Sequence, residues 1–144
     1  MYKVRFHHPY LSGLQHANLL KSFILSQISQ FKSYKGININ IIFVSDDFLL
    51  SLNKSHLQHD YYTDIITFDL SDTTDNLIAE LYISVDRVKD NAKVLNFYYQ
   101  NELRRVIFHG ILHLLGQADK TDEESKLMRS KEEDWLTLFA RHLL

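Results

Sequence analysis

The 144-residue sequence contains no cysteine, one proline and four glycines. Without cysteine the chain can form neither a disulfide nor a thiolate metal site, and its composition suits a reducing compartment. So few prolines and glycines predict long helices and strands joined by short loops. The chain has no Pro-, Gly- or Ser-rich linker, internal repeat or low-complexity stretch. We therefore expect a single domain over residues 1–144.

The chain also lacks a long apolar run and a strong charge of either sign. Its first residues, MYKVRFHHPY, contain no long apolar run, so we expect neither a signal peptide nor a membrane span. We therefore expect a cytoplasmic protein with no membrane partner. The formal net charge of −2 argues against a surface coated in positive charge for binding nucleic acid, but it leaves room for a local basic groove. The chain is 45% hydrophobic, which is enough for a core.

The pattern of apolar and polar residues predicts the element order βαβαββααα. The expected strands lie at 3–7, 37–45, 63–70 and 77–85. The expected helices lie at 14–34, 46–53, 87–99, 101–115 and from 122 onward. The polar loop between the last two strands predicts an antiparallel hairpin. Together these elements predict an α+β fold, a small mixed sheet of about four strands covered by helices.

Several residues are suited to begin or end these helices. Ser45 or Asp46 can cap the second helix and Asp86 the third, because short polar side chains accept from free backbone N–H groups. Thr121 and the glutamate three residues later form a potential capping box for the last helix. Gly116 is placed to end the helix 101–115 in the left-handed conformation.

Two histidines four residues apart, His109 and His113, stand in the predicted helix 101–115. They lie together about 110° from the centre of the apolar face of this helix. Imidazoles at this spacing can reach one ion, and after the turn at Gly116 the carboxylate of Asp119 can join them. Zinc accepts such ligands and keeps a fourth position open. Alternatively, the histidines mark a half-buried helix face and Asp119 caps a helix.

Gly110 stands where an H-E-x-x-H zinc protease has its glutamate base. Peptide hydrolysis by that route is not expected, and we interpret Gly110 as allowing close packing against a neighbouring strand. Thr63 and Asp64 begin an apolar strand, where an unpaired carboxylate would be costly. We therefore expect Asp64 to be hydrogen-bonded. The two residues either support the site or only order the turn before the strand.

These motifs resemble the YbeY family of bacterial rRNA-maturation factors, which are metal-dependent endoribonucleases. The family signature H-G-x-L-H-L-x-G-x-D-H corresponds to HGILHLLGQAD at residues 109–119. A second block, L-N followed by T-D-V-L-S-F, corresponds to Leu52–Asn53 and residues 63–68. A third, G-D-I-x-I-S, corresponds to residues 79–84. The three blocks occur in the family's order.

The resemblance implies one Zn²⁺ per chain, held by His109, His113 and Asp119. It implies a hydrolase that cleaves phosphodiester bonds of single-stranded RNA, in the maturation of the 3′ end of 16S rRNA and in ribosome quality control. The implied partners are small-subunit rRNA and the small ribosomal subunit with its proteins, and not DNA. Attack on the RNA by water or by its own 2′-hydroxyl is equally consistent with the sequence.

Two departures from the family pattern matter for the site. Asp119 stands where the family's third ligand is histidine; a carboxylate still binds zinc, but its charge weakens the Lewis acid and favours harder ions such as manganese. Leu57 stands where the family has an arginine important for activity, and leucine cannot stabilise negative charge on a phosphate. Arg104, Arg105 and Lys120 lie near the ligands in sequence and are candidates for the missing catalytic cation. For each, the alternative is a solvated surface charge.

The sequence is therefore consistent with three functions. The leading one is a zinc-dependent endoribonuclease. The second is a non-catalytic ribosome-assembly factor that binds rRNA or a ribosomal protein and holds a structural metal, which Leu57 supports. The third is a metal hydrolase with another substrate, supported only by the open coordination position. His56 and His59, near Leu57, are interpreted as loop residues rather than ligands.

Overall fold

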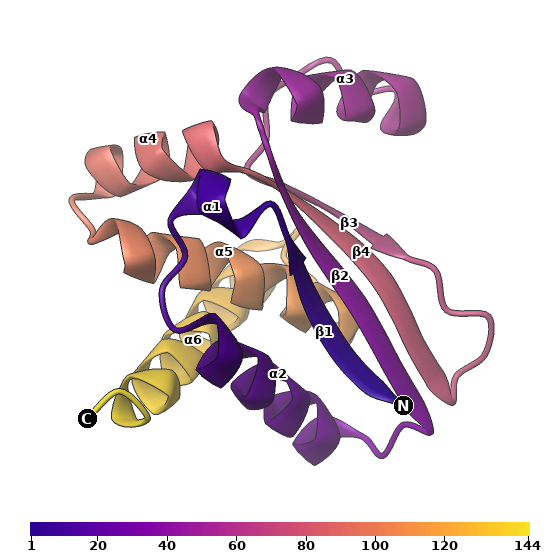
Figure 1. Ribbon diagram of the computed structural model, residues 1–144. Helices are drawn as coiled ribbons and strands as arrows, with labels where there is room; N and C mark the ends of the chain where they lie inside the picture. Colours follow the sequence, from indigo (N-terminus) through magenta and orange to yellow (C-terminus); the bar gives the residue numbers. More distant parts are fainter.

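A four-stranded mixed sheet organises the computed structural model, which describes residues 1–144 (Figure 1). The strands are β1 (Tyr2–His7), β2 (Gly36–Val44), β3 (Ile65–Asp69) and β4 (Asn76–Ser84). They lie in the order β1-β2-β4-β3; β1, β2 and β4 are parallel, and the edge strand β3 runs antiparallel to β4. The predicted α+β class, the mixed sheet of four strands and the antiparallel hairpin are confirmed.

Six helices connect the strands. They are α1 (Pro9–Ser12), α2 (Ala17–Phe31), α3 (Asp46–Leu57), α4 (Val85–Leu95), α5 (Tyr99–Leu114) and α6 (Asp122–Arg141). Apart from α1, they follow the predicted order. The sequence pattern did not predict α1, because a helix of one turn is too short to show an apolar period. No helix is both long enough and apolar enough to cross a bilayer.

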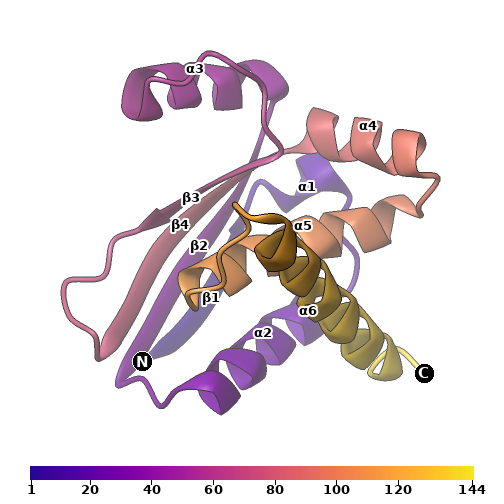
Figure 2. The same ribbon diagram turned by 180° about the vertical axis from the view of Figure 1, so that it is seen from behind.

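The core lies on the face of the sheet that α2 and α5 cover, with α6 packed against α5 (Figure 2). The strands β2 and β4 alternate buried and half-buried side chains, as expected for a sheet with one core face. The helix α5 buries ten of its sixteen residues, so it is the central helix of the core. In both views α3 lies at one end of the sheet, away from α2, α5 and α6 (Figures 1 and 2).

The helix ends follow the predicted signals with one exception. Ser45 caps α3, and Thr121 forms the capping box of α6. Gly116 follows α5 with a φ of +98°, in the predicted left-handed region. The exception is α4, where Ser84 is the cap and accepts from a backbone N–H, while Asp86 lies in the first turn. The carboxylate of Asp86 instead accepts from the backbone of α3, so the prediction for Asp86 was wrong.

Candidate metal centre

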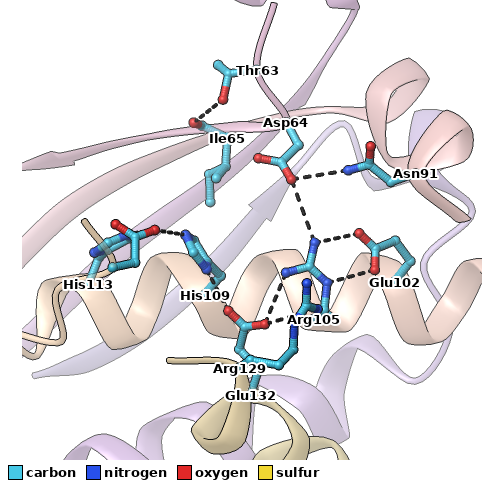
Figure 3. A network of polar contacts seen from close by, with 11 residues as sticks. Thr63, Asp64, Ile65, Asn91, Glu102, Arg105, His109, His113, Arg129 and Glu132 are labelled. Carbon is cyan, nitrogen blue, oxygen red and sulfur yellow. Dashed lines mark hydrogen bonds and ion pairs between the residues drawn. The ribbon is translucent and has the colours of Figure 1, made fainter. Parts of the chain in front are cut away.

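The helix α5 and the turn after it bring the three predicted ligands together. Figure 3 shows the two histidines side by side on α5. The Nε2 atoms of His109 and His113 each lie 3.3 Å from the same oxygen, Oδ2 of Asp119. One ligand atom from each residue lies within 4.8 Å of the others. The chain reverses at Gly116, which is why a carboxylate that follows α5 returns to its last turn.

These distances match a tetrahedral metal site. Two atoms that each lie about 2.0–2.1 Å from a tetrahedral zinc ion are roughly 3.3 Å apart. A charge-assisted hydrogen bond would bring nitrogen and oxygen to about 2.7–2.9 Å. The observed 3.3 Å therefore fits two ligands of one ion better than a direct bond between the side chains. The His-His-Asp group can hold a metal ion.

A carboxylate from α6 orients the imidazole of His109. Oε2 of Glu132 lies 2.6 Å from Nδ1 of His109, and Glu132 is only 1% exposed. Nδ1 therefore carries the proton and donates it, which leaves the lone pair of Nε2 free for a metal. The sequence pattern did not single out Glu132. The available signal was a charged residue on the apolar stripe of α6, between Met128 and Trp135.

Arg105, one of the predicted catalytic cations, lies next to His109 along α5, in a buried ion-pair network (Figure 3). Its Nε and Nη2 donate to the two carboxylate oxygens of Glu102 at 2.7 and 2.6 Å. Its Nη1 donates to Oε1 of Glu132 at 3.0 Å, and its Nη2 lies 3.8 Å from Asp64. The guanidinium therefore fixes the carboxylate that orients His109.

This network sets the protonation of its members. Burial would lower the pKa of Arg105, but the hydrogen bonds and charges of Glu102 and Glu132 raise it above its ordinary value. Burial would likewise raise the pKa of Glu132, but the hydrogen bond of His109 and the charge of Arg105 hold it below its usual range. Glu132 thus stays ionised beside His109. Burial dominates for Asp64 and raises its pKa despite the nearby positive charge of Arg105.

The other two predicted cations lie away from this network. Arg104 is 7% exposed, and its guanidinium lies over the ring of Phe139 at 5.1 Å from the ring centre. Burial lowers the pKa of Arg104. Lys120 is exposed on the turn next to Asp119. The three cations near the ligands in sequence thus have three different surroundings.

Two of the residues predicted to support the site, Thr63 and Asp64, lie directly before β3. Asp64 accepts a hydrogen bond from the amide of Asn91 at 3.2 Å, as the cost of an unpaired carboxylate led us to expect. The hydroxyl of Thr63 donates to the backbone oxygen of Ile65 at 3.4 Å, a long contact. Asp64 therefore joins the ion-pair network through Arg105, while Thr63 lines the cleft described below.

Gly110 allows α5 to approach the sheet closely. A Cβ at this position would lie 2.6 Å from Cδ1 of Ile65 and 2.6 Å from Cδ2 of Leu81. No carbon atom fits at that distance unless a neighbour moves. The expected role of Gly110, close packing against a strand, is confirmed, and this packing brings His109 and His113 next to β3.

A cleft of about 410 Å³ opens beside the ligands. Its walls come from the end of α3 and the following loop, from β3, and from His113 and Leu114 of α5. Because His113 lines it, the cleft reaches the candidate metal centre. Leu57, at the position of the family arginine, also lines this cleft and is 41% exposed.

Comparisons with known proteins agree with this arrangement. Residues 9–140 match the family model described as Endoribonuclease YbeY. The chain is 46% identical over 114 residues to Endoribonuclease YbeY of Cytophaga hutchinsonii, which covers 79% of this chain and 80% of the relative. It is 43% identical over 119 residues to that of Christiangramia forsetii, with 83% and 82% covered. The solution structure of TM1509 from Thermotoga maritima aligns with a TM-score of 0.61 at 26% identity, over 99% of this chain and 91% of that one.

The fold and the site define an α+β protein whose central helix carries a His-His-Asp group that can hold a metal ion. The chain belongs to the endoribonuclease YbeY family. The resemblance drawn from three short sequence blocks is therefore confirmed. It places the chain in a family of metal-dependent enzymes.

Proposed function

We propose that this protein is a zinc-dependent endoribonuclease that cleaves single-stranded RNA. The observation that carries the proposal is the group of His109, His113 and Asp119, whose spacing matches three ligands of one ion. Two imidazoles and one carboxylate are a donor set that zinc accepts in catalytic sites, with one coordination position left open. The relatives of this chain carry the name Endoribonuclease, which supports RNA as the substrate.

The chain's own residues give this centre a defined shape and charge. Glu132 holds His109 in the tautomer that leaves Nε2 free, and Arg105 holds Glu132 in place. Gly110 keeps both histidines close to β3, and the cleft beside His113 gives an extended strand access to the centre. When bound, Zn²⁺ supplies Lewis-acid chemistry toward a phosphodiester.

The proposed biological role is the maturation of the 3′ end of 16S rRNA and ribosome quality control in the cytoplasm. Its partners are single-stranded regions of small-subunit rRNA and the small ribosomal subunit with its proteins, and they include neither DNA nor a membrane. The support for this role is membership of the YbeY family, which the sequence blocks had already associated with rRNA maturation.

A second candidate function is a non-catalytic ribosome-assembly factor with a structural metal. The observation that favours it is Leu57, which places an apolar side chain in the wall of the cleft where the family has a cation. Arg105 does not fill that gap, because carboxylates surround its guanidinium. This candidate predicts a bound metal without RNA cleavage.

Metal content and RNA cleavage, measured together on the full chain without a tag, test the proposal. We expect about one zinc per chain and cleavage of a single-stranded oligoribonucleotide, with no action on peptides or small esters. His113→Ala and Asp119→Ala are expected to lose both properties, while His56→Ala, which changes an exposed histidine outside the site, keeps them. Zinc binding without cleavage would favour the assembly factor. Absence of zinc after zinc is supplied would overturn both candidates.

A further inference from the structure

The cleft beside His113 contains one further side chain that can carry a positive charge, His59. We propose that the imidazole of His59 binds a phosphate of the RNA strand that occupies this cleft. The inference rests on the proposed function and assigns His59 as a substrate-binding residue. His59 lies in the loop after α3, where its sequence context alone does not distinguish it from an ordinary loop histidine.

The position of the cleft points to a nucleotide as its occupant. His113 belongs both to the candidate metal centre and to the cleft wall. A strand that places a phosphodiester at the centre therefore continues into this cleft. The volume of about 410 Å³ lies within the range of about 300–1,000 Å³ that small-molecule sites have.

The charges around the cleft favour His59 as the phosphate contact. Proteins bind phosphates through cationic side chains and N–H or O–H donors. No lysine or arginine lines the cleft, and His113 is directed at Asp119. The one acidic residue in the walls is Asp69, on β3. His59 is therefore the side chain through which this cleft can attract a phosphate by charge.

Tyr61 leaves the second nitrogen of His59 available as a donor. The Tyr61 hydroxyl lies 2.9 Å from Nδ1 of His59, and the two rings stack at 21° with their centres 5.1 Å apart. When the hydroxyl donates to Nδ1, the neutral imidazole carries its proton on Nε2. In the charged imidazole Nε2 carries a proton as well. Because Nε2 forms no hydrogen bond within the protein, it can donate to a phosphate oxygen in both states.

Asn53 holds the His59–Tyr61 pair in place. Asn53 is 2% exposed, and its backbone oxygen accepts from the N–H of His59 at 3.1 Å. Its side-chain amide donates to the backbone oxygen of Tyr61 at 2.9 Å. One buried residue therefore binds the loop at both members of the pair. A site held in this way loses little conformational freedom when a ligand binds.

Steady-state cleavage of a fluorescent single-stranded oligoribonucleotide by the zinc-loaded full chain tests the inference. His59→Phe keeps a ring to stack on Tyr61 but removes both nitrogens, and His59→Arg restores a cationic donor. We expect His59→Phe to raise KM about tenfold, the effect of losing one charge-assisted hydrogen bond, with kcat nearly unchanged. His59→Arg is expected to recover most of the loss. The matched control His56→Phe changes an exposed histidine outside the cleft and is expected to leave KM as it is.

Binding measured without cleavage separates this inference from the proposed function. In the Asp119→Ala background, fluorescence anisotropy gives the Kd of the same oligoribonucleotide. We expect His59→Phe to weaken binding about tenfold there as well. If the wild type cleaves RNA while His59→Phe changes neither KM nor Kd, the inference is wrong and the proposed function stands. If the wild type does not cleave RNA but His59→Phe still weakens binding, the proposed function fails and the phosphate contact is supported.

Discussion

Glu132 offers the sharpest test of how this site is built, through the substitution Glu132→Gln. The carboxylate accepts from Nδ1 of His109 at 2.6 Å and from Nη1 of Arg105 at 3.0 Å. Glutamine has nearly the same shape but only one accepting oxygen, so it can satisfy one of these donors and not both. We expect the variant to fold and to bind zinc more weakly, because the tautomer of His109 is no longer fixed by a charge.

The expected loss of zinc affinity follows from these two hydrogen bonds. If the glutamine oxygen stays with His109, a bond to a charged acceptor becomes neutral, and its contribution falls from about 1.5–3 to about 0.5–1.5 kcal/mol. The difference of about 1–1.5 kcal/mol is roughly a tenfold loss of zinc affinity. If the oxygen turns to Arg105, Nδ1 loses its acceptor. The loss then approaches about 100-fold, the upper end for a residue that orients a metal ligand.

The same substitution has a bounded effect on the stability of the metal-free protein. Breaking a buried ion pair outright costs about 3–5 kcal/mol, because one charge is left unpaired. Here Arg105 keeps both hydrogen bonds to Glu102, at 2.6 and 2.7 Å, so its charge stays paired. We therefore expect a smaller loss of unfolding free energy, about 1–3 kcal/mol, from the weakened bonds alone.

Competition with a chelator gives the zinc affinity, and urea unfolding of the metal-free protein gives the free energy of unfolding. Glu133→Gln is the matched control, because Glu133 is the next residue of α6 and its side chain is exposed. It makes the same change of charge without touching His109. A folded Glu132→Gln variant with the zinc affinity of the control would refute the reasoning, since it would show that Nδ1 of His109 needs no carboxylate.

Three further predictions concern other parts of the site. Gly110→Ala should lower the free energy of unfolding by about 1–3 kcal/mol, because the new Cβ would lie 2.6 Å from methyl carbons of Ile65 and Leu81. A loss below about 0.5 kcal/mol in urea unfolding would contradict this. The pKa of Asp64 is raised in the folded protein, so the folded state binds the proton more tightly than the unfolded state does. The stability that this proton provides is therefore lost as the pH rises from about 4 through the raised pKa. Asp64→Asn should remove this loss in unfolding curves measured against pH. Asp119→His should raise the preference for zinc over manganese in metal competition, because it removes the carboxylate ligand.

The fold was largely predictable because its signals are local. The segment ININIIFVS alternates and then becomes continuously apolar, and it forms β2, a strand buried on one face. The capping box at Thr121 and the left-handed Gly116 also depend on a few neighbouring residues, and both are present. Each of these features needs no knowledge of distant parts of the chain.

The N-cap of α4 is a feature that local sequence signals could not predict. Ser84 and Asp86 are both suitable N-caps, and they lie two residues apart. The backbone N–H of Asp46, at the start of α3, donates to the carboxylate of Asp86 at 2.9 Å. The hydroxyl of Ser84 then accepts from the N–H of Arg87. A contact between two helices thus decides between two locally equivalent caps, which a single sequence does not reveal.

The metal ligands could likewise be predicted from local sequence, whereas the residue that orients them could not. His109, His113 and Asp119 fall within one helix end and one turn, so helical geometry and the glycine turn were enough to bring them together. Glu132 comes from the following helix, and its role depends on how α6 packs on α5. The sequence nevertheless carried a hint, since a fully buried carboxylate on an apolar stripe needs a donor, and a half-buried histidine is a suitable one.

Proximity in sequence was a poor guide to the catalytic cation. Arg105 precedes His109 by one helical turn and shares its side of α5, but Glu102 and Glu132 bind its guanidinium there. Arg104 lies about 100° further around the helix and covers Phe139. His59 is far from the ligands in sequence, but the packing of the α3–β3 loop beside α5 makes it line the same cleft as His113. The guanidinium of Arg105 is bound by carboxylates and that of Arg104 lies over Phe139. The positive charge near the RNA can therefore come from the metal centre, from His59 in the cleft wall and from Lys120, which is exposed beside Asp119.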